Sequence, residues 1–92
     1  MSQIRFLSIP QLCRHYQLEV NFLEQLIEYG LIETQQVENQ ACLHDDALPA
    51  LEKYIRLHYE LDINPEGIQV IAQLLERIQR MESELHLLKA RL

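Results

Sequence analysis

The sequence predicts a mainly α-helical protein, with a winged helix-turn-helix domain followed by a long C-terminal helix that dimerises as a coiled coil. Three observations predict this fold. Short apolar helical faces alternate with turn residues in the first half, a polar stretch without helical period follows, and an uninterrupted apolar repeat fills the end. We assign residues 1–62 to the winged domain and residues 63–92 to the coiled-coil helix.

The first half carries two short helices. The apolar opening Ile4–Leu7 fits a strand, and Ser8 followed by Gln11 predicts a capping box at the start of the first helix. Gln17–Leu18 form the turn, and Gly30 stops the second helix because glycine tolerates a left-handed conformation there. The positions expected to face the core are Ile9, Leu12, Cys13, Tyr16, Leu23, Leu26, Ile27, Leu31 and Ile32.

A wing and a third helix come next. Residues 33–46 have no helical period and predict a small hairpin, even though no Asn-Gly turn is present. Asp45 or Asp46 is expected to cap the third helix, with Pro49 in its first turn. The apolar stripe expected on this helix is Leu48, Leu51, Tyr54, Ile55, His58 and Leu61.

The last helix begins at Asn64–Pro65 and is expected to run to the end of the sequence. Its apolar residues follow a 3–4 spacing that is typical of the a and d positions of a coiled coil. They are Ile71, Leu74, Ile78, Met81, Leu85, Leu88 and Leu92. Flanking charges support pairing in either direction: Arg77 with Glu82 and Glu84 with Lys89 if parallel, or Arg77 with Glu84 if antiparallel. The alternative is that this helix packs back on its own domain.

The charge distribution disfavours DNA as a partner. The net charge is −6, and no Lys or Arg occurs between His15 and Glu52. The second helix, which would enter the major groove of DNA, carries Glu24 and Glu28 instead of the cations that phosphates and guanine edges require. The same acidity disfavours an anionic membrane surface.

The remaining features indicate a cytoplasmic protein that is not an enzyme. No signal-peptide pattern and no 18-residue apolar run occur. Cys13 and Cys42 are expected to be free thiols in a reducing compartment. Cys42 and His44 have neither zinc-site spacing nor an identifiable oxyanion partner, so we expect no catalytic residue, no metal and no cofactor.

Five segments in this order resemble the CbpM family of chaperone modulators, part of the MerR-like helix-turn-helix group. They are "FLSIPQLC", "LIEYGLIE", "HDDAL", "RLHYELDINPEGI" and "LLERIQRMESELHLLKARL", which together span nearly the whole chain. The resemblance implies a cytoplasmic homodimer that binds the J-domain of a CbpA-like, DnaJ-type co-chaperone and blocks its action with DnaK. J-domains carry a basic second helix, which an acidic surface complements.

The expected contacts are therefore acidic residues with aromatic anchors among them. They are Glu19, Glu24, Glu28, Asp45 and Asp46, with Tyr29 and Tyr59 as the anchors. Gln17 and Glu19 depart from the Gly and Ser/Thr that helix-turn-helix proteins commonly place in the turn and at the second cap. Two rival hypotheses are a MerR-type transcriptional regulator that touches DNA through Lys53 and Arg56, and a purely structural dimer adaptor.

Overall fold

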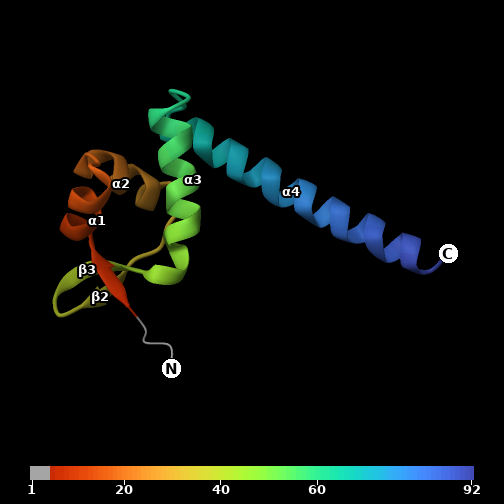
Figure 1. The fold of residues 1–92 in the computed structure, drawn as a ribbon, viewed down its shortest axis with the longest axis horizontal. Coiled ribbons are helices and arrows are strands. Elements are labelled where there is room, and N and C mark those ends of the chain that lie inside the picture. The colour runs from red at the N-terminus through yellow and green to blue at the C-terminus, as the bar shows by residue number, and fades with distance from the viewer. Residues whose placement is uncertain (1–4) are drawn as a thin grey trace.

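A small helical body with a three-stranded sheet carries one long projecting helix in the computed structural model, which describes residues 5–92 (Figure 1). The elements in chain order are β1 (Phe6–Ser8), α1 (Ile9–Tyr16), α2 (Val20–Glu28), β2 (Gln35–Val37), β3 (Gln40–His44), α3 (Leu48–Tyr59) and α4 (Pro65–Ala90). A single 3₁₀ turn, Asp45–Ala47, joins β3 to α3. The predicted winged helix-turn-helix order with a long final helix is confirmed. Of the predicted opening strand, Ile4 lies outside the described residues.

The helix-turn-helix begins with the predicted capping box. The backbone N–H of Gln11 donates to the Ser8 hydroxyl (3.3 Å), and the Gln11 side-chain oxygen accepts from the backbone N–H of Ser8 (2.8 Å). Gln17 ends α1 in the left-handed region, at φ 57°, so the turn forms without glycine. Gly30 ends α2 at φ 73°, and the N–H of Leu31 reaches back to the carbonyl of Leu26. This is the Schellman pattern that glycine favours.

The wing is a tight antiparallel hairpin. β3 lies in the middle of the sheet, in the order β1-β3-β2, so the N-terminal strand pairs with the hairpin. The two-residue turn consists of Glu38 and Asn39, at φ 51° and 66°. Two consecutive positive φ angles are what a two-residue hairpin turn needs, and Asn accepts them more readily than most residues. The predicted hairpin is confirmed.

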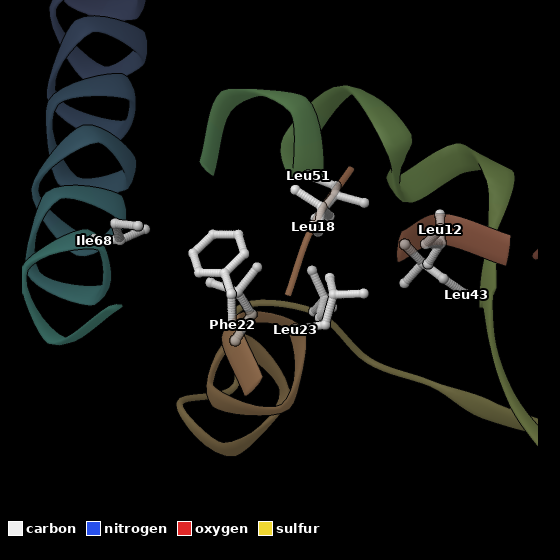
Figure 2. Close-up of a cluster of buried hydrophobic side chains, with 9 residues drawn as sticks. Leu12, Leu18, Phe22, Leu23, Leu43, Leu51 and Ile68 are labelled. Atoms are coloured by element: carbon white, nitrogen blue, oxygen red, sulfur yellow. The ribbon is translucent and has the colours of Figure 1, made fainter. Parts of the chain in front are cut away.

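The core joins every element except β2. Figure 2 shows Leu12 of α1, Phe22 and Leu23 of α2, Leu43 of β3 and Leu51 of α3 in one cluster, with Ile68 of α4 at its edge. Leu23, Leu26 and Leu51 are fully buried as predicted. Leu18 and Phe22 are also buried, although the sequence assigned Leu18 to the turn and gave Phe22 no core role.

Two predictions about α3 are wrong. Neither aspartate caps the helix; both lie inside the 3₁₀ turn, whose N-cap is His44, and the Nδ1 of His44 accepts from the backbone N–H of Asp46 at 3.0 Å. Leu61 is not part of the apolar stripe, because α3 ends at Tyr59 and Leu61 is 63% exposed in the following turn.

α4 leaves the body after its first turns. Asn64 caps it as predicted, with its side-chain oxygen 2.7 Å from the backbone nitrogen of Gly67, and Pro65 and Ile68 are buried. Every residue from 73 onward is exposed, and Figure 1 shows the helix running away from the body. The alternative prediction, that α4 packs back on the domain of its own chain, is therefore wrong. The helix ends at Ala90, so Leu92 lies just past it.

Candidate protein-binding surface

The outer face of α2 is acidic and free of cations. Glu24 and Glu28 are both exposed and lie one helical turn apart, so they share a face. Among residues 5–92 no Lys or Arg nitrogen lies within 4.0 Å of a carboxylate oxygen, and the only contacts of this kind join the His44 imidazole to Asp45 and Asp46. The α2 carboxylates are therefore not neutralised by any described Lys or Arg, and they remain available to a basic partner.

Glu19 and Tyr59 lie side by side, although 40 positions separate them in the sequence. The backbone N–H of Glu19 donates to the Tyr59 hydroxyl at 3.4 Å. The rings of Tyr59 and Phe22 make a T-shaped contact at a centroid distance of 5.4 Å, and Tyr59 stays 45% exposed. The structure thus places an aromatic side chain from the end of α3 beside the N-cap of α2.

Tyr29 links the end of α2 to α4. Its hydroxyl donates to the Glu66 carboxylate at 3.0 Å, and the side-chain amide of Gln69 donates to the Tyr29 carbonyl at 3.0 Å. The hydrogen bond to Glu66, with smaller contributions from burial and from the charges of Glu66 and Glu28, raises the pKa of Tyr29. Tyr29 is therefore half-buried and held against α4 by these two hydrogen bonds. It brings Glu66, a carboxylate that sequence reasoning missed, close to the acidic face.

Asp45 and Asp46 lie away from this group. They precede α3, whereas Tyr59 is its last residue, and twelve helical residues span about 18 Å. The His44 Nδ1 is 3.3 Å from an Asp45 oxygen and 3.5 Å from an Asp46 oxygen. The structure therefore does not bring these two aspartates together with Glu19 and Tyr59.

His44, Asp45 and Asp46 also form the one group among residues 5–92 whose spacing suits a metal ion, with ligand atoms within 4.8 Å of one another. Asp46 is exposed, and the imidazole nitrogen facing the carboxylates already accepts the hydrogen bond that starts the 3₁₀ turn. The trio is thereby accounted for as a helix start.

The two thiols occupy structural positions. Cys42 is buried in β3, and Cys13 is half-buried on α1. Burial raises the pKa of the Cys13 thiol, whereas a nucleophilic cysteine needs a lowered pKa. None of the helices formed by residues 5–92 has the length and hydrophobicity of a membrane span.

Comparison with known proteins agrees with this architecture. The family model described as "MerR HTH family regulatory protein" matches residues 7–90. The Chaperone modulatory protein CbpM of Pseudomonas entomophila (strain L48) is 30% identical over 87 residues, which cover 94% of this chain and 86% of that relative. The protein of the same name from Pseudomonas putida (strain W619) gives the same values.

A more distant relative has the same name. The Chaperone modulatory protein CbpM of Escherichia coli O139:H28 (strain E24377A / ETEC) is 27% identical over 86 residues, with 92% of this chain and 85% of the relative covered. The chain therefore belongs to the MerR helix-turn-helix family and, within it, to the CbpM family of chaperone modulatory proteins.

Proposed function

We propose that this protein is a non-enzymatic chaperone modulator that binds the J-domain of a CbpA-like, DnaJ-type co-chaperone and inhibits its action with DnaK. The names of the relatives support the chaperone-modulating role. The acidic, unpaired face of α2 supports a basic partner, and the resemblance to the CbpM family supports the J-domain as that partner.

The absence of ion pairs on α2 carries the proposal. Glu24 and Glu28 are exposed where a DNA reader of this fold presents cations, and no described Lys or Arg pairs with them. Complementary potential steers association and suppresses partners of like charge. This face therefore attracts the basic second helix of a J-domain and repels a phosphate backbone.

We further propose that the acting species is a homodimer joined through α4. The projecting helix exposes the seam residues Leu74, Ile78, Met81, Leu85 and Leu88 by 49–60% each. Exposed apolar side chains repeating every three to four residues along a helix are the pattern that a second helix covers. A dimer would present two acidic faces to two J-domains.

The experiment is a charge reversal with a matched control. The double variant Glu24→Lys, Glu28→Lys should lose J-domain binding in isothermal titration calorimetry and should no longer inhibit J-domain stimulation of the DnaK ATPase. Glu33→Lys, at an exposed acid outside α2, should bind as the unaltered protein does. Unchanged J-domain binding by the double variant would remove α2 from the interface.

Transcriptional regulation is the second candidate, favoured by the description of the matching family model. Lys53 and Arg56 are exposed on α3, where a phosphate backbone would contact them under this hypothesis. If the protein is a transcriptional regulator, the unaltered protein binds DNA, and its affinity falls steeply with salt. The double variant Glu24→Lys, Glu28→Lys should then bind DNA more tightly than the unaltered protein does. A structural adaptor would show neither effect.

A further inference from the structure

The body exposes large apolar side chains at one end only. Among residues 5–92, all the large hydrophobic residues that are exposed lie on α4 or at Leu92, apart from Val20 (48%), Tyr59 (45%) and Leu61 (63%). Val20 follows the N-cap of α2, Tyr59 ends α3, and Leu61 lies in the turn to α4. An exposed apolar cluster away from the dimer seam needs its own explanation.

Contacts hold this end of the molecule in one arrangement. The Tyr59 hydroxyl accepts from the backbone of Glu19, which places it beside Val20. The His58 ring stacks on Phe22 with centroids 4.4 Å apart, and both His58 and Tyr59 therefore attach the end of α3 to α2.

The turn that carries Leu61 is fixed at both ends. The backbone N–H of Ile63 donates to the Leu57 carbonyl at 3.0 Å, and the His58 Nδ1 is 2.8 Å from the Ile63 carbonyl oxygen. Asp62 adopts φ 56°, which turns the chain sharply toward α4. Leu61 is thus held outward by a bonded turn, and a partner would meet a preorganised contact that costs little ordering entropy.

Carboxylates alternate with these apolar residues. Glu19, Glu60 and Asp62 are exposed, and none of them has an ion-pair partner among residues 5–92. The nearest cation along the chain is Arg56, one helical turn before Glu60. An apolar centre surrounded by unneutralised acids matches a helix that carries aliphatic residues on one face and Lys or Arg beside them.

We infer that this acidic–apolar tip is the docking site for a basic amphipathic helix of the partner protein. The tip consists of Glu19, Val20, Tyr59, Glu60, Leu61 and Asp62. The inference rests on the proposed function in that the helix belongs to the J-domain, and it adds to that function the apolar contacts and a place at the end of α3. It also predicts that charge on α2 alone does not account for the affinity.

Two leucines of equal exposure provide the test. Leu61 and Leu87 are both 63% exposed, and Leu87 lies on α4 outside the a and d positions. With the isolated J-domain of a CbpA-type co-chaperone as probe, Leu61→Ser should weaken binding about tenfold or more, as truncation of an interface hot spot does. Leu87→Ser should bind within about twofold of the unaltered protein, because this site makes no proposed contact.

A second pair of changes tests the acids without altering shape. Glu60→Gln with Asp62→Asn should lower the association rate and flatten its dependence on salt, since rim charges act mainly on encounter. If the Leu61→Ser and Leu87→Ser variants bind the J-domain with equal affinity, the tip is not the docking site, while the proposed J-domain binding itself still stands.

If the unaltered protein binds no J-domain, the proposed function fails. The acidic–apolar tip is then tested separately, with a synthetic amphipathic helical peptide that carries Leu on one face and Lys on the other. Amide chemical-shift changes centred on residues 19–20 and 59–62 would support the tip. Changes elsewhere, or none, would overturn it.

Discussion

Replacing Ile78 tests whether α4 is a dimer seam, because this residue lies at a central a position of the projecting helix. In the single chain Ile78 is 49% exposed and Leu85 is 53% exposed. Fully burying an aliphatic side chain of this size stabilises by about 1.5–3 kcal/mol. About half of each side chain remains to be covered, which gives about 1 kcal/mol per copy and about 2 kcal/mol per dimer.

Ile78→Ala should therefore weaken dimerisation by about thirtyfold, since 1.4 kcal/mol corresponds to about a factor of ten. Ile78→Asp should give monomer throughout, because it would also desolvate a carboxylate in each copy. Sedimentation velocity across a concentration series measures both, with Ser83→Asp on the opposite helix face as the control that stays dimeric. An unaltered protein that sediments as a monomer, or an Ile78→Asp variant that remains a dimer, would refute this reasoning.

Three further predictions concern the body. Gly30→Ala should lower the free energy of unfolding by about 1 kcal/mol in urea titrations. Apart from its chain neighbours, no atom lies within 4 Å of the added methyl, so the cost is that of φ 73° alone, and an unchanged midpoint would contradict it. Leu23→Ala should cost about 3 kcal/mol or more, seen as a large drop in melting temperature by circular dichroism, because Leu23 is completely buried. Burial and the 2.8 Å hydrogen bond to Glu52 raise the pKa of Tyr16 to about 12 from 10. The free energy of unfolding should therefore fall as pH rises from 10 to 12, and this fall should be smaller in the Tyr16→Phe variant. An identical alkaline profile in the Phe variant would show that Tyr16 is not responsible.

The sequence predicts the elements well because their boundaries depend on local chemistry. The signals for helix ends act through backbone groups within a few residues, so the sequence alone predicts them. They are Ser8 with Gln11, Gly30, and Asn64 with Pro65. The 3–4 repeat of apolar residues along α4 is local in the same sense, and it predicted both the helix and its apolar face.

The errors arise where distant residues decide the outcome. Phe22 is buried because α3 places His58 against its ring, which the helical period of α2 alone does not reveal. His44 displaces the aspartates as a cap because pairing with β1 fixes the end of β3 and leaves the imidazole facing the following turn. Leu61 fits the stripe by spacing, yet α3 ends at Tyr59, two residues before it.

The candidate site likewise has features that the sequence predicts and features that depend on contacts between distant residues. The acidity of α2 is visible in the sequence, since it depends on which residues occupy one helix face. The pairing of Glu19 with Tyr59 and of Tyr29 with Glu66 joins positions 40 and 37 apart, and only the folded chain brings them together. The spatial separation of Asp45 and Asp46 from Tyr59, in contrast, is set by the length of α3, a local feature that the sequence already indicates.

Titration of the unaltered protein with the isolated J-domain of a CbpA-type co-chaperone, in parallel with duplex DNA over a salt series, tests the central claim most directly. The account predicts saturable J-domain binding that is lost with Glu24→Lys and Glu28→Lys, and no measurable DNA binding at physiological salt. DNA binding with a steep salt dependence and no J-domain binding would contradict it.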